Sequence, residues 1–411
     1  MFLSDPAVSH TPTRWQAFTA APHRMLFFLG VCQAVLVMIW WTVELFGRLG
    51  LWRLPPTVLP PAVVHQYLML YGLFPFFVFG FLFTVYPRWM SAPVVPPARY
   101  VPVFLLLAGG VGLFYPGLFT SLAVLALAVG LMFAGWVMAL YSLVRVYRAA
   151  RNRCTHERIL NAALAAGAAG IAVYLLGMLK GEALFFNLAR ELGLWLFLVP
   201  VLFSVGHRMI PFFSEAVLPH YTLVRPAWSL PLMGVCVMGH AATELSGFPE
   251  WRFVFDLPLG LAALYHSWAW GLRRSFEARM LAMLHIAFAW LAFALLLYAL
   301  QSLALLAGEA DLLGRAPLHA LGIGFAGGLM VAMVSRVTLG HSGRPLVADR
   351  LTWYGFLGLN GVALGRVLTE FSPHAGLWNA VAAAGWLACL LPWALRYAPV
   401  YLRSRADGRP G

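Results

Sequence analysis

Long apolar stretches alternate with short polar ones along the chain, and this pattern predicts a protein built from membrane-spanning helices. Each stretch has about 20 residues, enough for a helix that rises about 1.5 Å per residue to cross a hydrocarbon core about 30 Å thick. A Tyr115-Pro116-Gly117 sequence predicts that the third helix is short and forms a tight hairpin with the fourth. We predict about twelve helices, over residues 26–46, 62–86, 101–115, 118–147, 159–179, 190–211, 227–246, 253–272, 279–306, 317–339, 351–371 and 375–402.

The composition supports the same fold class. Hydrophobic residues make up 62% of the 411 residues and charged residues only 10%, and the mean hydropathy is +0.80. These values are typical of an integral membrane protein and exclude an ordinary soluble enzyme. We therefore expect an all-α, polytopic membrane helix bundle that forms a single domain over residues 1–411. This domain would include a cytoplasmic N-terminal segment at 1–24 and a cytoplasmic tail at 403–411.

The positions of the basic residues predict the orientation in the membrane. Cytoplasmic loops accumulate Lys and Arg, and most of the 28 such residues fall on one side if the N-terminus is cytoplasmic. Twelve helices would then place both termini in the cytoplasm. The net charge of +13 is spread over many short loops, which favours contact with anionic lipid over nucleic acid.

Histidines at the ends of the predicted helices are the candidate ligands for a metal or cofactor. Neutral imidazole binds haem iron and copper, and helix bundles build such sites from side chains on facing helices. With few carboxylates in the membrane and no paired cysteines, haem or copper is favoured over calcium or magnesium. For any single histidine, the alternative is a polar residue near the interface, bonded to a backbone carbonyl. With the predicted orientation, the outer layer contains His65, His240 and His319, and the inner layer contains His207, His266, His285 and His341.

Two functions fit this pattern. One is a haem-bearing, redox-active membrane protein. The other is a secondary transporter in which histidines relay protons. Transporters of this size usually contain internal repeats, and the two halves of this chain show no convincing repeat. The first function is therefore favoured.

One segment carries a family resemblance. Residues 318–346, LHALGIGFAGGLMVAMVSRVTLGHSGRPL, form an apolar helix that begins with His319 and ends with His341. This segment resembles the signature of the NnrS family, which combines a Leu-His-Ala-Leu start, a helix of small residues and a Gly-His-Thr/Ser-Gly-Arg-Pro-Leu end. Further similarity is found in APHRMLFFLG (21–30), GFLFTVYPRW (80–89), HRMIPFFS (207–214) and MLHIAFAWL (283–291).

The resemblance implies a multi-pass protein of the bacterial inner membrane that contains haem and copper and takes part in the response to nitric oxide. It also implies a small gaseous ligand such as nitric oxide and an electron donor in the membrane or the periplasm. One departure concerns copper. The family usually has Trp-His-Ala-His-Glu-Met on its second helix, where this chain keeps His65 but has Tyr67 and Leu68 in place of the second histidine and the glutamate.

The resemblance, together with a looser analogy to the large subunit of haem–copper oxidases, implies particular site residues. His65 and His319 are expected to be the axial ligands of a haem b. Arg366 is expected to meet a haem propionate, although an i,i+4 pair with Glu370 is equally compatible with the sequence. A second metal or haem site is expected on the inner side, near Arg336 and Arg344. Its ligands would be His285 and His341, with His207; His240 is a further candidate ligand in the outer layer.

Overall fold

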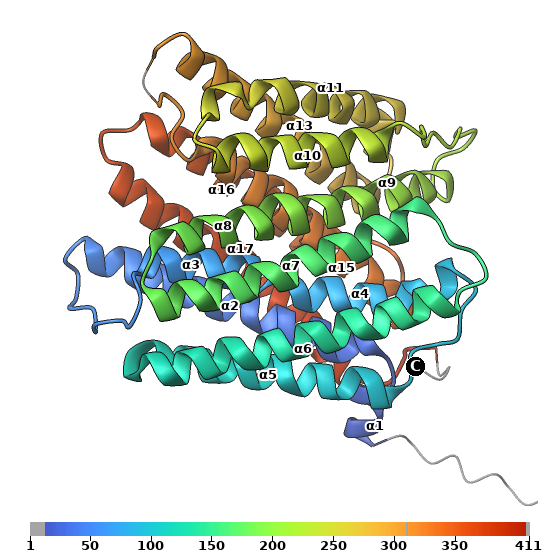
Figure 1. Ribbon diagram of the computed structural model, residues 1–411. Helices are drawn as coiled ribbons and strands as arrows, with labels where there is room; N and C mark the ends of the chain where they lie inside the picture. Colours follow the sequence, from blue (N-terminus) through green and yellow to red (C-terminus); the bar gives the residue numbers. More distant parts are fainter. Residues whose placement is uncertain (1–12, 310, 408–411) are drawn as a thin grey trace, which may run out of the picture.

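The protein is a bundle of long helices that lie side by side, as the computed structural model shows (Figure 1). The structure describes residues 13–309 and 311–407, and the regular structure within these ranges is helical throughout. This result confirms the predicted all-α class. Exposed side chains on the helix surfaces include Leu127 (58% exposed) and Trp268 (78% exposed), as expected for helices that face lipid rather than water.

Nine helical segments in the described ranges are long and apolar enough to cross a membrane. Three of them are built from two or three consecutive elements: α3 (Pro61–Leu70) with α4 (Phe74–Trp89); α8 (Ala183–Gly193), the π-helix η1 (Leu194–Leu198) and α9 (Val199–Glu215); and α14 (Ala316–His319), the π-helix η3 (Ala320–Gly327) and α15 (Gly328–His341). The other six are α2 (Pro22–Arg48), α5 (Pro97–Thr120), α6 (Leu122–Ala149), α7 (Thr155–Lys180), α13 (Arg279–Leu306) and α17 (Ala375–Tyr401).

Three further helices match the remaining predicted spans but are shorter or less apolar. They are α10 (Ser229–Leu245), α11 (Phe253–Ala269) and α16 (Arg350–Leu368). All twelve predicted segments are therefore helical, while the number that cross the membrane stays a prediction beyond the nine. Short helices occur at α1 (Arg14–Thr19), η2 (Pro249–Trp251), α12 (Leu272–Ser275) and η4 (Thr369–Phe371).

The prediction of a short third helix was wrong. Helix α5 continues through Pro116 to Thr120, because an interior proline removes only its own N–H donor when the chain can accommodate the ring. The turn to α6 comes at Ser121, whose Oγ accepts a hydrogen bond from the backbone N–H of Val124 at 3.3 Å. The α5–α6 hairpin is tight, as expected, but it lies one helical turn later.

Both ends of the described chain lie at the same end of the bundle, which we call the terminal face (Figure 1). Arg24 at the start of α2 donates from Nε to the carbonyl of Tyr401 at 3.2 Å, and from a second nitrogen to the carbonyl of Arg403. Successive long helices run alternately away from and towards this face, so their other ends form the opposite face. The cytoplasmic location of the terminal face stays a prediction.

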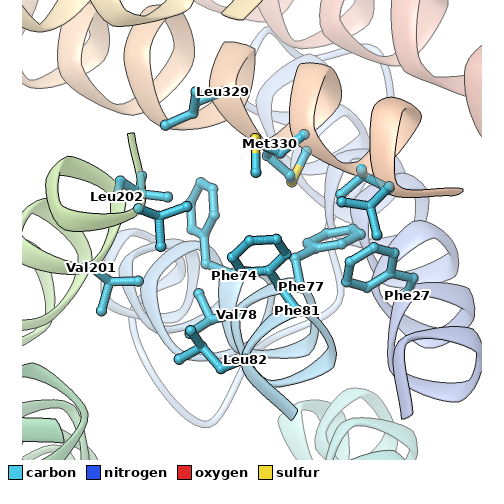
Figure 2. A pocket seen from close by; sticks show the side chains of 14 residues that line it. Phe27, Phe74, Phe77, Val78, Phe81, Leu82, Val201, Leu202, Leu329 and Met330 are labelled. Atoms are coloured by element: carbon cyan, nitrogen blue, oxygen red, sulfur yellow. The ribbon is translucent and has the colours of Figure 1, made fainter. Parts of the chain in front are cut away.

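The centre of the bundle is apolar. A cavity of about 50 Å³ lies among α2, α4, α9 and α15, and its lining side chains are all hydrophobic. Phe74, Phe77 and Phe81 of α4 face Leu329 and Met330 of α15 in this region (Figure 2). The polar groups that could carry chemistry consequently lie towards the two faces of the bundle.

Candidate functional site

His65 lies in the second turn of α3, near the opposite face, and its ring is held by Trp41 of α2. The two rings are stacked, with 4.0 Å between centroids and 10° between planes. The Nδ1 atom of His65 is buried and has no hydrogen-bond partner. A buried polar atom without a partner is costly, so this imidazole fits a role in which a ring nitrogen binds a metal.

His319 is the last residue of α14, and the backbone fixes its tautomer. Its Nδ1 lies 2.9 Å from the carbonyl oxygen of Arg315. Because a carbonyl can only accept, Nδ1 carries the proton and Nε2 keeps its lone pair. A histidine whose Nδ1–H is bonded to a carbonyl while Nε2 is free has the form in which imidazole binds a metal.

His65 and His319 lie in one neighbourhood near the opposite face, together with several cations. His319 lies within electrostatic range of His65, and Arg315 and Arg366 lie within that range of both imidazoles. Arg366 is buried and forms an ion pair with Glu370 at 2.5 Å. The i,i+4 pair therefore exists, and Arg366 also lies beside the histidines.

Sequence reasoning missed three contributors to this site. From the sequence, Trp41 is expected to be an aromatic residue of the membrane interface. In the structure its ring instead stacks on His65. Arg48 places its guanidinium 5.3 Å from the centroid of the Trp41 ring and pairs with Glu44 at 2.9 Å. Arg315 fixes the His319 tautomer through its backbone. The contact between His319 and Arg315 could have been predicted, because residues four positions apart lie on the same face of a helix.

Tyr67 and Leu68 pack in the core, as expected from their side chains. Both are fully buried, and the Tyr67 hydroxyl lies 3.3 Å from the sulfur of Met132. The Tyr67 ring also packs against Tyr174, with 4.5 Å between centroids. Aromatic and sulfur atoms thus occupy the position at which relatives are expected to have a second histidine and a glutamate.

His240 is engaged in a different contact near the opposite face. Its Nδ1 lies 2.6 Å from Oδ1 of Asp256, and the ring stacks on Trp195 with 3.5 Å between centroids. The other carboxylate oxygen of Asp256 is buried without a partner. Trp195 belongs to the π-helix η1, and such helices are frequent at functional sites.

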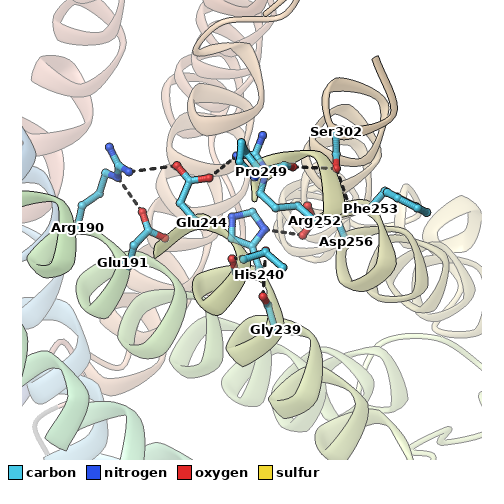
Figure 3. A network of polar contacts seen from close by, with 11 residues as sticks. Arg190, Glu191, Gly239, His240, Glu244, Pro249, Arg252, Phe253, Asp256 and Ser302 are labelled. Carbon is cyan, nitrogen blue, oxygen red and sulfur yellow. Dashed lines mark hydrogen bonds and ion pairs between the residues drawn. The ribbon is translucent and has the colours of Figure 1, made fainter. Parts of the chain in front are cut away.

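A chain of ion pairs lies beside this histidine (Figure 3). Arg190 contacts Glu191 at 2.8 Å and Glu244 at 3.4 Å, and Glu244 also contacts Arg252 at 2.8 Å. The network joins α8, α10 and the start of α11. It links the three helices at the opposite face. Its ion pairs do not include His65 or His319.

The inner-side histidines do not converge as predicted. His341 packs against His23, with 4.7 Å between ring centroids. His207 bonds through Nδ1 to His156 at 3.0 Å. His285 lies 2.9 Å from the hydroxyl of Ser214.

Each of the three inner histidines therefore has a different neighbour. Arg336 likewise does not face them: its guanidinium lies 3.9 Å from the centroid of the Phe213 ring. His266 approaches His207, with 5.6 Å between centroids. Both ring nitrogens of His266 and the Nε2 atom of His207 are buried without partners. The residues that the structure describes include no group of three or more His, Cys, Asp or Glu arranged to hold a metal ion.

Two histidines of the terminal face, His23 and His156, were not predicted. His23 donates from Nδ1 towards the Thr84 hydroxyl at 3.3 Å, since that hydroxyl itself donates to the carbonyl of Gly80. His156 lies in the first turn of α7, beside the ion pair of Arg208 with the buried Glu157. Neither lies in an apolar stretch of the sequence, which is why hydropathy did not single them out.

Comparison with known protein families supports the resemblance noted in the sequence. Residues 17–405 match the family described as NnrS protein, which is nearly the whole chain. No curated protein matches the chain. The matched region includes every helix from α2 to α17 and both histidines of the opposite-face site. The chain therefore belongs to the NnrS protein family.

Proposed function

We propose that this protein is a haem-binding membrane protein of the NnrS type that takes part in the response to nitric oxide. The observation that carries this proposal is the location of His65 and His319 near one another at one end of the bundle, each with a ring nitrogen suited to a metal. Membership of the NnrS family supports the same class of function.

The residues present fit a haem b between the two imidazoles. His65 and His319 would hold the haem iron, with Trp41 supporting the first ring and the Arg315 carbonyl orienting the second. Arg366 and Arg315 would neutralise the propionates, because cations and carboxylates attract strongly where water is excluded. A haem with two imidazole ligands supplies one-electron transfer.

The protein would lie in the bacterial inner membrane with the terminal face in the cytoplasm, in contact with anionic lipid. Nitric oxide would be the small ligand, and a donor in the membrane or periplasm would supply electrons. Less copper is expected than in relatives with the full motif, because Tyr67 and Leu68 provide no strong donor to replace an imidazole and a carboxylate.

The test is an optical spectrum and metal analysis of the purified protein with three single substitutions. The unmodified protein should have a six-coordinate, low-spin haem with sharp bands in the reduced state. His65→Ala and His319→Ala should each abolish that spectrum or reduce the haem content several-fold. His374→Ala is the matched control, since His374 is exposed at the same face. If both site variants keep the unmodified spectrum, the ligand assignment is wrong.

A further inference from the structure

A pocket at the terminal face is lined by none of the candidate histidines. It has a volume of about 490 Å³ and lies between the loop after α15 and the last turns of α17. The loop belongs to the Gly-His-Ser-Gly-Arg-Pro-Leu segment at 340–346 and the residues that follow. Three arginines and one aspartate line the pocket: Arg344, Arg396, Arg403 and Asp349.

The charges in this pocket are not balanced by its own lining. Asp349 caps α16 by accepting from the backbone N–H of Thr352 at 2.9 Å, and its other oxygen contacts Nε of Arg396 at 3.3 Å. The single carboxylate of the lining is therefore already engaged. Arg344 and Arg403 add two further positive charges.

Arg344 is incompletely hydrogen-bonded in this pocket. Its Nη1 atom is buried and has no hydrogen-bond partner. Partial burial, together with the charges of Arg403 and Arg396, lowers the pKa of the Arg344 guanidinium. An anion between these side chains would satisfy the nitrogen and relieve the repulsion.

The rest of the lining is apolar and leads towards the lipid-facing surface. Leu339, Val347, Leu395 and Val400 form the walls. Val347 is 66% exposed and Leu395 is 69% exposed. A free anion would not be stabilised by these apolar walls, whereas acyl chains would bury their apolar surface.

We propose that this pocket binds the phosphate headgroup of an anionic phospholipid, with its acyl chains running along α17. The shared chemistry is a phosphate held by Arg344, Arg403 and Arg396, since planar guanidinium groups bind phosphate oxygens in pairs. Basic pockets between helices at the membrane surface are known to hold such headgroups. The proposal goes beyond the proposed haem function and does not depend on it.

The experiment uses the full-length protein in nanodiscs of phosphatidylcholine with increasing phosphatidylglycerol. Thermal unfolding and native mass spectrometry report binding. The site variant is Arg344→Gln with Arg403→Gln. Its matched control is Arg148→Gln with Arg151→Gln, which removes the same charge from exposed positions of the same face.

Phosphatidylglycerol should raise the unfolding temperature of the unmodified protein and of the control, and should remain bound in the mass spectrum. The site variant should bind it about thirtyfold more weakly, as expected when two cations near the membrane surface are lost. An equal loss of phosphatidylglycerol binding in both variants would show that the lipid is attracted by the basic face as a whole, and would contradict binding in this pocket. The same stabilisation by inorganic phosphate without phosphatidylglycerol would overturn the lipid as the source.

A second variant keeps the proposal testable if the double substitution does not fold. Val347→Glu places a negative charge at the exposed rim of the pocket without altering the core. It should weaken phosphatidylglycerol binding, while Val347→Gln should leave binding nearly unchanged. Unchanged binding in Val347→Glu would contradict the proposal.

Discussion

The imidazole of His65 lies flat on the indole of Trp41, 4.0 Å away between ring centroids. This contact comes from different helices and fixes the plane in which His65 can present a ring nitrogen. Trp41→Ala should weaken haem retention roughly three- to tenfold, because a stacked aromatic pair contributes about 0.5–1.5 kcal/mol. Trp41→Phe should keep most of the haem. The haem-to-protein ratio after purification measures both, and equal ratios in all three proteins would refute a positioning role.

Arg366 should influence the reduction potential of the proposed haem. A nearby cation stabilises the reduced form, so Arg366→Gln should lower the midpoint potential by tens of millivolts, where about 59 mV corresponds to a tenfold change for one electron. Arg366→Lys keeps the charge and should lower it less. Redox titration monitored optically gives both values. An unchanged potential in Arg366→Gln would mean that Arg366 serves only its ion pair with Glu370.

Copper content should respond to the core position of Tyr67 and Leu68. We expect less copper per haem than in relatives with the full Trp-His-Ala-His-Glu-Met pattern, because a phenol and an aliphatic chain replace two donors. Tyr67→His with Leu68→Glu should raise it, and Tyr67→Phe with Leu68→Met is the control for a disturbed core. Elemental analysis provides the measurement. Stoichiometric copper in the unmodified protein, insensitive to these changes, would place copper elsewhere.

The contacts of the terminal-face histidines predict which pairs of substitutions have non-additive effects on the free energy of unfolding. His156 and His207 are in contact at 3.0 Å, so the effects of His156→Ala and His207→Ala on unfolding should deviate from additivity by about 0.5–3 kcal/mol. His285→Ala and His341→Ala should be additive within about 0.5 kcal/mol. Unfolding in detergent, with metal analysis of each variant, checks this. Strong coupling of His285 with His341, or a shared loss of metal, would restore the predicted joint site.

The buried ion pair of Glu157 and Arg208 should be important for stability. Glu157 is fully buried, and Arg208 contacts it at 2.6 Å. Arg208→Ala would leave a buried carboxylate without its cation and should lower the free energy of unfolding by about 3–5 kcal/mol. Arg274→Ala breaks the exposed pair with Glu277, 3.7 Å apart, and should cost less than about 1 kcal/mol. Similar losses in the two variants would contradict the buried-pair argument.

Hydropathy alone determined where the helices are. Twelve apolar stretches correspond to twelve helical segments, with ends that differ by a few residues, because a stretch of about 20 apolar residues in lipid must satisfy its backbone within a helix. The placement of His65 and His319 at one end also followed from the sequence. Alternating helix direction assigns each helix end to a face, and both histidines start a helix on the same side.

Only the tertiary structure decided which side chains meet. A helix that is apolar on all sides carries little information about its rotation, and a residue one position along the chain points about 100° away. His285, His341 and His207 share a depth but contact different neighbours, so a shared depth did not determine which side chains meet. The stack of Trp41 on His65, the pairing of His23 with His341, and the arginine pocket beside α17 depend on how helices rotate and loops fold back, which local sequence patterns do not specify.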